Sequence, residues 1–575
     1  MATINEAEKV TYFALTDSRN KKIPFGIKAK DRTKHTYIIG KTGMGKSTVL
    51  ENMAVQDIQS GNGIAFVDPH GKSAELLLEY VPESRMKDVL YIAPFDTDFP
   101  VSFNVMEDVG VNKRHLVVNG LMSAFKKIWV DAWSARMEYI LNNILLALLE
   151  YPGSTLIGVN RMLSDKDYRK KVVANISDPS VKAFWVDEFA KYGERYMQEA
   201  GAAIQNKIGQ FISNPLVRNI IGQPHSTFDL REMMDEKKIV IINLSKGRVG
   251  EQNANLLGSM LITKIYLAAM SRADVSPSDL NLLPQFYLYV DEFQSFANES
   301  FADILSEARK YKLNLTIAHQ YIEQMSDEVR AAVFGNVGTM IVFRIGSYDA
   351  EVLEKEFAPK FTSEDIVNLG IFQIYLKLMI DGVSSQPFSA TTMPPIALQP
   401  VSFKDKILEN SRATFARPRI DVERDVSQQT GGQIEASVVP PSHSEIRSSS
   451  QAPAAPFARS ENPRPPQRFD NRNVQRSAPA APFVRSENSR SQTNAQTVPR
   501  AQMARPSLAP SDGFSSLKEI AQKIPVSSKK AGTEEHKQNL REALAGVMKT
   551  AGTLPKVVTP PVKEVPEEVL KNILE

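Results

Sequence analysis

The 575-residue sequence contains no cysteine. Disulfide bridges, thiolate metal sites and cysteine nucleophiles are therefore excluded, and the composition suits a reducing cytosol. The chain also has little net charge, only +3 at pH 7. Overall charge thus gives no argument for nucleic-acid binding, and any basic surface must be local.

Long apolar runs are absent as well. Ile144–Leu149 is among the longest, whereas a membrane-spanning helix needs roughly 18 apolar residues. The N-terminal residues lack the basic and apolar regions of a signal peptide. We therefore expect a cytoplasmic protein with no direct membrane span. It either stays in the cytosol or is recruited by partners to the inner face of the cell membrane.

The chain does contain a full match to the phosphate-loop pattern G-x-x-x-x-G-K-[ST], at Gly40–Ser47. The apolar, β-branched run Thr36–Ile39 precedes it and predicts a buried strand. Leu50, Met53 and Ala54 follow at helical spacing. This strand–loop–helix context predicts a nucleoside triphosphate site; the plainer alternative is a glycine-rich turn without nucleotide.

Each part of the loop has a predicted role. Backbone N–H groups would surround the phosphates at the positive end of a helix, Lys46 would place its charge on the terminal phosphates, and the Ser47 hydroxyl would ligate Mg²⁺. We expect ATP and Mg²⁺ as the cofactors. The predicted nucleotide contacts are Gly40, Lys41, Thr42, Gly43, Met44, Gly45, Lys46, Ser47 and Thr48.

Along the first 400 residues, short apolar runs typical of strands alternate with segments whose apolar residues have helical spacing. The exception is the stretch between about 111 and 235, where all segments are predicted to be helices. The alternation predicts an α/β fold with a mostly parallel sheet covered by helices, interrupted by an all-α insertion domain. All three tryptophans lie in the insertion, so we expect it to have a small core of its own. The predicted domains are a short N-terminal β segment (1–35), a P-loop ATPase core (36–110 and 236–400), and the insertion (111–235).

The composition changes near residue 411. Residues 411–512 hold fourteen arginines, nine acidic residues and no lysine, and the segment 452–462 recurs almost unchanged as 478–488. Such a segment buries too little apolar surface to fold, which predicts a disordered linker at 411–515. Its repeat is either a duplicated linker or a partner-binding element. Short helical docking segments are predicted within 516–575, the last one grouping Val569, Leu570, Ile573 and Leu574 on one side.

A second motif supplies the residues for hydrolysis. The apolar run Phe286–Val290 ends at Asp291 and Glu292, as in a Walker B strand. We expect Asp291 to hold Mg²⁺ through its water shell and Glu292 to polarise the attacking water. A further strand, Leu313–Ala318, leads to Gln320, which is either a γ-phosphate sensor or a solvated strand end.

Two arginines are candidates for a residue that stabilises the transition-state charge from a neighbouring subunit. Arg309 lies at the edge of a predicted apolar helix stripe, and Arg344 follows the predicted strand Thr339–Phe343. An exposed helix charge is an equally good interpretation of Arg309, and Arg344 carries the same alternative.

Taken in order, these motifs resemble the FtsK/HerA superfamily of DNA-pumping ATPases. The motifs are Gly40–Ser47, Asp68–Gly71, Asn104, Asp291-Glu292, and Arg309-Lys310-Tyr311 eleven residues before Gln320. Within that superfamily the chain is most similar, over roughly residues 20–395, to type IV secretion and conjugation coupling proteins of the TraG/TraD kind.

The resemblance implies a RecA-like core, homo-hexameric rings, and movement of DNA through the pore. It also implies secretion-channel or relaxosome-type partners, which the C-terminal tail would bind. We therefore expect an ATP-driven DNA translocase for conjugation or type IV secretion. The alternatives are a secretion or pilus-assembly ATPase that moves protein without DNA, and a HerA-like repair translocase.

Overall fold

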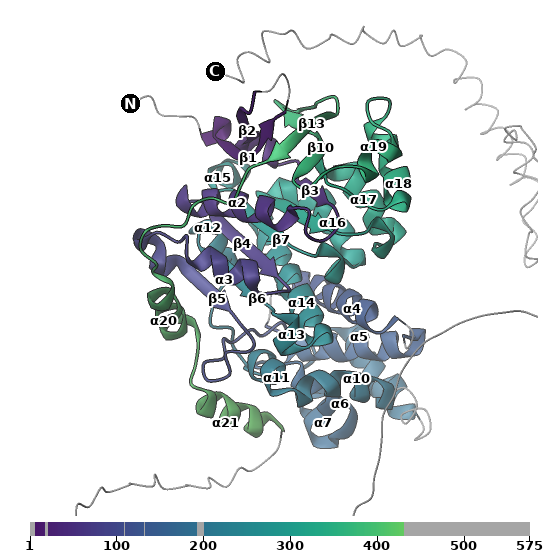
Figure 1. The fold of residues 1–575 in the computed structure, drawn as a ribbon. Helices are drawn as coiled ribbons and strands as arrows, with labels where there is room; N and C mark the ends of the chain where they lie inside the picture. The colour runs from purple at the N-terminus through teal and green to yellow at the C-terminus, as the bar shows by residue number, and fades with distance from the viewer. Residues whose placement is uncertain (1–5, 18–20, 108–109, 131–132, 193–200, 431–575) are drawn as a thin grey trace, which may run out of the picture. The chain divides into compact units, whose positions relative to one another are not determined.

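The computed structural model describes residues 6–17, 21–107, 110–130, 133–192 and 201–430. They form an 11-stranded sheet, in the order β2-β1-β13-β10-β9-β3-β8-β7-β4-β6-β5, with helices on both faces (Figure 1). The strands are β1 (Val10–Thr16), β2 (Pro24–Lys28), β3 (Thr36–Ile39), β4 (Gly63–Asp68), β5 (Val89–Ile92), β6 (Ile239–Asn243), β7 (Phe286–Val290), β8 (Leu313–His319), β9 (Thr339–Val342), β10 (Gln373–Lys377) and β13 (Phe388–Thr392).

The part of the sheet from β9 to β5 is parallel, as the sequence predicts. Every residue of β3, β4, β6 and β7 is buried. Their uninterrupted apolar character follows from this environment, because a parallel sheet covered on both faces has no side that can be polar.

The other end of the sheet, β2-β1-β13-β10, is antiparallel. The predicted N-terminal β segment is therefore an edge of the same sheet. The predicted hairpin after residue 372 is also present: β10 pairs with β13, and a small inner hairpin of β11 (Met379–Ile380) and β12 (Val383–Ser384) turns at Asp381 and Gly382, both with positive φ.

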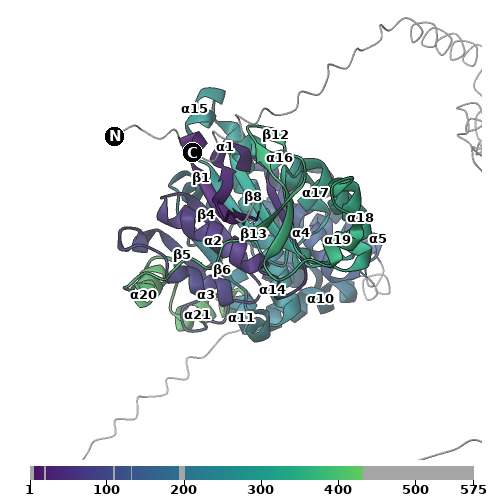
Figure 2. The ribbon, with the colours of Figure 1, turned by 45° about the horizontal axis from the view of Figure 1, so that its top comes forward.

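Helices cover the two faces of the sheet unequally. On one face α2 (Lys46–Gln59) and α3 (Lys72–Leu78) pack on residues such as Ile38 and Phe66 (Figure 2). On the other face, helices pack on the alternate strand residues, such as Ile39 and Val67. These are α14 (Glu251–Met270), α16 (Glu299–Glu307), α17 (Asp327–Asn336) and α18 (Ser347–Phe357); α1 (Ala29–Arg32), α13 (Lys246–Val249), α15 (Pro277–Leu282) and α19 (Ser363–Val367) complete the core.

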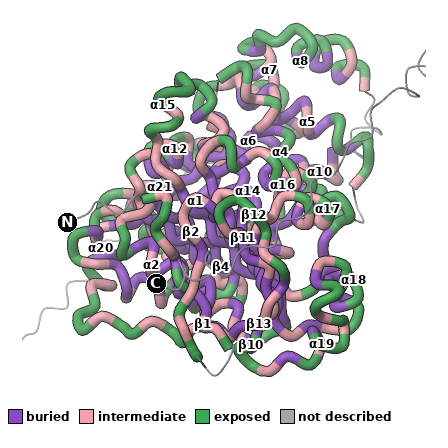
Figure 3. The backbone as a smooth tube through the Cα atoms, turned by 90° about the horizontal axis from the view of Figure 1, so that it is seen from above, coloured by how far each residue is buried: buried purple, intermediate pink, exposed green. Residues whose placement is uncertain are grey.

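The insertion is all-helical within the described residues, as predicted. It comprises α4 (Arg114–Ile128), α5 (Ala135–Glu150), α6 (Ile157–Ser164), α7 (Lys166–Asn175), α8 (Pro179–Ala183), α10 (Ala202–Ser213), α11 (Pro215–Ile221) and α12 (Leu230–Asp235). The expected separate core is wrong. Trp129 and Trp185 belong to one apolar cluster that continues through α14 to the strands, because α4 packs directly on α14 (Figure 3).

The predicted boundary of the C-terminal linker is also wrong. Residues 404–415 form α20 (Lys404–Phe415) and residues 419–430 form α21 (Arg419–Thr430). Val422 and Val426 of α21 pack on Ile157 of the insertion, and Ile407 of α20 is fully buried. The arginine-rich composition hid these helices, because charged residues on their exposed sides outnumber the few apolar anchors. The rest of the predicted linker and the docking segments lie outside the described residues.

One helix among the described residues, α14 with the turn after it (251–274), is long and apolar enough to cross a membrane. It lies in the interior of the fold, where Leu257, Leu261 and Ile265 pack against the sheet and the insertion. Its apolar character is explained by burial within the protein.

Candidate nucleotide-binding site

The sheet topology gathers the predicted catalytic motifs at one edge. Strand β8 lies between β3 and β7, with Ile39 beside His319 and Val290 beside Ile317. The carboxyl ends of parallel strands meet at the same edge. The loop that follows β3, the glutamine that follows β8 and the carboxylates that follow β7 are therefore neighbours.

The phosphate loop has the backbone that its glycines permit. Gly43 and Gly45 have φ values of +80° and +116°, and α2 begins directly after them. A Cβ on Gly40 would lie 2.5 Å from Cβ of Phe343, so only glycine fits there. The Lys41 N–H donates to the Arg344 carbonyl at 2.8 Å, which anchors the loop to the strand β9 side.

Lys46 lies under this loop. Its side chain is buried, and Nζ donates to the Lys41 carbonyl at 3.3 Å. Burial lowers the pKa of Lys46, while the carboxylates of Glu292 and Asp291 oppose this shift. Among the described residues, a backbone carbonyl is the hydrogen-bond partner of this buried ammonium, and such an ammonium favours an anion, which is the predicted role of Lys46 toward the phosphates.

Ser47 and Asp291 are brought together as predicted for a Mg²⁺ site. The Ser47 hydroxyl donates to Oδ2 of Asp291 at 2.9 Å. Burial, with the nearby charges of Glu292 and Asp68, raises the pKa of Asp291 to about 6. Among the described residues no lysine or arginine forms an ion pair with this carboxylate. A hydroxyl beside a carboxylate that forms no ion pair with the described side chains suits a hard divalent cation.

Glu292 has an unusual conformation, with φ of +47°, and both of its carboxylate oxygens accept hydrogen bonds from amides. Gln320 Nε2 donates to Oε1, and Gln294 Nε2 donates to Oε2. Oε1 of Gln320 in turn accepts from the Thr42 hydroxyl at 3.0 Å. Gln320 thus connects the phosphate loop to Glu292, which favours a sensor over a solvated strand end.

Gln294 was not predicted from the sequence. It lies in a one-turn helix (Phe293–Ser295) that follows Glu292, and the turn brings its side chain back to the carboxylate two residues earlier. The available signal was an amide two residues past a catalytic acid. No periodic pattern in the sequence indicates Gln294, because the positive φ of Glu292 ends the regular geometry of β7.

The two candidate arginines lie at opposite edges of the sheet. Arg344 follows β9 at the carboxyl edge, where its carbonyl holds Lys41. Arg309 is exposed in a short helix (Ala308–Tyr311) that precedes β8, so it lies at the amino edge. The seven residues of β8 separate it from Gln320, about 23 Å along the strand. Arg309 therefore cannot reach the phosphate loop of its own chain.

Asp68 and Asn104, two other motif residues, make hydrogen bonds that hold the fold around the site, and His70 of the same motif as Asp68 has its Nε2 4.0 Å from Oε1 of Glu292. Asp68 accepts hydrogen bonds from the backbone N–H groups of His70 and Ala74 at 2.8 and 2.9 Å, which orders the start of α3. Asn104 donates to the carbonyls of Ser154 and Pro224 at 2.8 and 2.7 Å and so holds the entry and exit of the insertion together.

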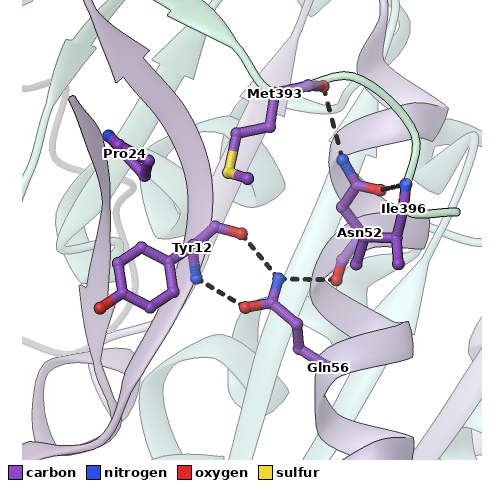
Figure 4. A pocket seen from close by; sticks show the side chains of 6 residues that line it. All are labelled: Tyr12, Pro24, Asn52, Gln56, Met393 and Ile396. Atoms are coloured by element: carbon purple, nitrogen blue, oxygen red, sulfur yellow. Dashed lines mark hydrogen bonds between the residues drawn. The ribbon is translucent and has the colours of Figure 1, made fainter. Parts of the chain in front are cut away.

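A separate hollow of about 480 Å³ lies between β1 and α2, away from the phosphate loop (Figure 4). Its polar side chains are already used. Gln56 bonds both backbone groups of Tyr12, and Asn52 bonds the Pro394 carbonyl and the Ile396 N–H. These amides fasten the edge strand and the segment after β13 to α2, which indicates a structural role.

Among the described residues, no cluster of three or more His, Asp or Glu side chains offers a metal site made by protein ligands alone. The predicted Mg²⁺ site, with Ser47 and Asp291 as its protein groups, is of the kind that depends on phosphate oxygens and water for the remaining ligands.

Two family profiles match the part of the chain that forms this site. Residues 14–265 match the profile of the central domain of helicase HerA, and residues 285–367 match the profile described as the TraM recognition site of TraD and TraG. No curated protein matches the sequence.

Solved structures share the fold at low sequence identity. The unbound bacterial conjugative coupling protein TrwB is 13% identical, with a TM-score of 0.50, over 69% of this chain and 91% of that one. TrwB in complex with ADP and Mg²⁺ is 14% identical, with a TM-score of 0.51 over the same shares. VirB4 of Thermoanaerobacter pseudethanolicus is 14% identical over 68% of this chain and 98% of that one, but its TM-score is only 0.43.

The fold and the site define a P-loop ATPase of the RecA-like kind. The chain resembles the FtsK/HerA superfamily over residues 14–265, and the C-terminal half of its core resembles TraG/TraD-type coupling proteins over residues 285–367. The predicted resemblance is thereby confirmed.

Proposed function

We propose that the protein is a Mg²⁺-dependent ATPase that drives DNA translocation as a coupling ATPase of conjugation or type IV secretion. The observation that carries the ATPase part is the continuous chain of contacts from Thr42 through Gln320 to Glu292, beside the Ser47–Asp291 pair. This arrangement connects a phosphate-binding loop to a candidate general base. Such a connection is expected in a site that hydrolyses a nucleotide and is not expected in a glycine-rich turn that binds none.

The residues at the edge would divide the work of hydrolysis. Lys46 and the loop N–H groups bind and orient the phosphates, and Mg²⁺ at Ser47 and Asp291 neutralises charge on their oxygens. Glu292 accepts the proton of the attacking water. Gln320, released from Glu292, can donate to the γ-phosphate, so the presence of that phosphate frees the base.

DNA is proposed as the substrate from the family. The HerA and TraG/TraD profiles cover most of the described chain, and TrwB, which shares the fold, is a conjugative coupling protein. The test is the rate of ATP hydrolysis with no DNA, with single-stranded DNA and with double-stranded DNA. Stimulation by either DNA supports the proposal. Hydrolysis that neither DNA changes would favour the protein-moving alternative.

A homo-hexameric ring is proposed as the active form. Arg309 lies too far from its own phosphate loop to act there, so it can contribute only across a subunit interface. Native mass spectrometry with ATP and Mg²⁺ should show a closed oligomer, and a monomer that hydrolyses ATP at the full rate would contradict this.

Residues beyond 430 are proposed to recruit secretion-channel or relaxosome-type partners and so to bring the protein to the membrane. Because α20 and α21 pack on the core and the insertion, the truncation that tests this must end after Thr430. The truncated protein should keep its basal ATPase rate and lose co-purifying partners. Loss of ATPase activity in a folded truncation would contradict a role limited to recruitment.

A further inference from the structure

Among the described residues, Lys127 of the insertion donates a hydrogen bond to the segment Phe293–Ser295 that follows Glu292. This residue lies in the last turn of α4, and its Nζ donates to the backbone carbonyl of Gln294 at 2.8 Å. Lys127 forms no ion pair with a carboxylate among those found in the described residues, and it is half-buried, which lowers its pKa. Partial removal of an ammonium from water without a carboxylate partner costs free energy. The position of Lys127 beside Gln294 therefore requires an explanation.

The residue that Lys127 contacts is the one that restrains Glu292. Gln294 offers its carbonyl to Lys127 and its side-chain Nε2 to Oε2 of Glu292. Its own Oε1 is buried without a hydrogen-bond partner, so the amide is oriented by the carboxylate alone. Movement of Lys127 relative to the loop would therefore be transmitted to the carboxylate of Glu292.

Helix α4 is suited to carry such movement. It approaches α14 so closely that a Cβ on Gly120 would lie 2.3 Å from Cγ2 of Thr263. Further along the same helix, the Ser123 hydroxyl accepts from the N–H of Ser300, in the first turn of α16. A helix that is packed at both points shifts together with α14 and α16, so a displacement of these helices carries Lys127 with it toward or away from the segment after Glu292.

We propose that Gln294 is a positioning residue that restrains Glu292, and that Lys127 couples this restraint to the position of the insertion. The proposal rests on the proposed ATPase function. The hydrogen bonds from Gln294 to Oε2 and from Gln320 to Oε1 fix the orientation of the carboxylate, which restrains Glu292 from turning toward an attacking water. ATP binding frees one oxygen through Gln320, and binding of DNA or another substrate to the protein frees the other through α4, so full turnover needs both.

The first test compares isosteric variants. Gln294→Met removes both amide groups, so the basal ATPase rate should rise about fivefold or more while the DNA-stimulated rate stays near that of the wild type. Lys127→Met disconnects α4, so the stimulated rate should fall toward the basal rate. Lys127→Arg keeps a donor and should restore stimulation. The matched control is Lys126→Met, whose side chain pairs instead with the exposed Glu299 at 2.9 Å. Unchanged stimulation in both test variants would overturn the proposal.

A second measurement does not depend on DNA or on turnover. Hydrogen exchange over residues 114–128 is followed as a non-hydrolysable ATP analogue and Mg²⁺ are added. The wild type and Lys126→Met should show the same change in α4, and Lys127→Met should show none; the same change in all three overturns the coupling. If the analogue does not bind to the wild type at all, the proposed ATPase function fails, and that result is distinct from either outcome for Lys127.

Discussion

The two edges of the sheet both bury carboxylates but satisfy them differently. At the amino edge, Asp57 accepts hydrogen bonds from Nη1 and Nη2 of Arg32, both at 2.8 Å, and also from the Tyr289 hydroxyl. At the carboxyl edge, the hydrogen-bond donors to Asp291 and Glu292 among the described residues are hydroxyl and amide groups, and His70 Nε2 lies 4.0 Å from Oε1 of Glu292. The first carboxylate has its cation within the fold, whereas the second pair is arranged for a cation and a water that come from outside.

The two candidate arginines also lie at different edges of the sheet. Arg344 is beside the phosphate loop and Arg309 is at the far edge of the same chain. A contribution from Arg344 can be made within one subunit, but one from Arg309 requires a neighbour. The comparison therefore predicts which substitutions at each edge affect catalysis and which affect folding alone.

The largest effect should come from Lys46→Ala at the carboxyl edge. Lys46 is the only charged side chain that the loop buries beneath the phosphates, so its loss should abolish ATP hydrolysis and weaken nucleotide binding. The measurement is phosphate release together with binding of a fluorescent ATP analogue. Normal turnover in this variant would remove the basis for assigning the carboxyl edge as the site.

Glu292→Gln should separate binding from chemistry. The amide cannot accept the proton of water, so turnover should fall by about 10²–10⁴-fold. Asp291 is unchanged, so Mg²⁺ and ATP should still bind with nearly wild-type affinity. Hydrolysis at the normal rate with Glu292→Gln would show that the Walker B assignment is wrong.

The placement of Lys46 and Glu292 at one edge of the sheet could be predicted from the sequence, as could the parallel strands and the helical insertion; the catalytic roles of the two residues remain predictions. The reason is local: a phosphate loop and an apolar strand that ends in two acids each specify their own geometry. Gln320 was predicted for the same reason, because it directly follows a strand that ends at the edge.

The contacts that could not be predicted are tertiary. Lys127 reaches Gln294 across 167 positions of sequence, and neither residue belongs to a motif. The helix α21 was missed because Val422 and Val426 are its buried apolar residues among those described, and the polar contacts that also hold it, such as Thr155 to Gln429, leave no pattern in the sequence. Neither spacing nor composition indicates where such residues dock; only the folded arrangement of α4, α11 and α21 does.

Mixed oligomers should decide between the two arginines. Removal of a group that stabilises transition-state charge lowers turnover by roughly 10²-fold or more. If Arg309 acts across the interface, mixing Arg309→Ala with Lys46→Ala subunits should restore part of the activity, because some sites then combine an intact loop with an intact arginine.

Arg344→Ala provides the contrast, since Arg344 lies at the loop of its own subunit. If Arg344 acts within one subunit, mixing Arg344→Ala with Lys46→Ala subunits should restore no activity. The ATPase rate of the mixture should equal the average of the rates of the two variants measured separately. Recovery with Arg344→Ala and none with Arg309→Ala, where mixed rings are shown to form, would reverse the assignment.

At the amino edge, Asp57→Asn should affect folding and not the chemistry. The substitution leaves the buried Arg32 guanidinium without its carboxylate, and such a change typically destabilises by about 3–5 kcal/mol. The free energy of unfolding is measured with denaturant, and the turnover of the folded fraction should be near that of the wild type. A loss below about 1 kcal/mol would show that this pair is not what stabilises the edge.

Asp291→Asn should have the smallest effect of these substitutions. It should raise the stability of the nucleotide-free protein, whereas Asp57→Asn lowers stability. The pKa of Asp291 is about 6 in the fold against an ordinary value of 3.8, so the folded protein holds this proton more tightly than the unfolded chain does. The stability that this provides is present at low pH and is lost as the pH rises through about 6.

At about 1.4 kcal/mol per pKa unit, ionised Asp291 costs the nucleotide-free protein at most about 3 kcal/mol at pH 7.5. The neutral amide of Asp291→Asn avoids this cost. In the absence of Mg²⁺ and nucleotide, the thermal midpoint of the variant should therefore exceed that of the wild type at pH 7.5 and match it at pH 4. Equal midpoints at both pH values would mean that the carboxyl edge compensates this charge as fully as Arg32 compensates Asp57, and the distinction between the two edges would then fail.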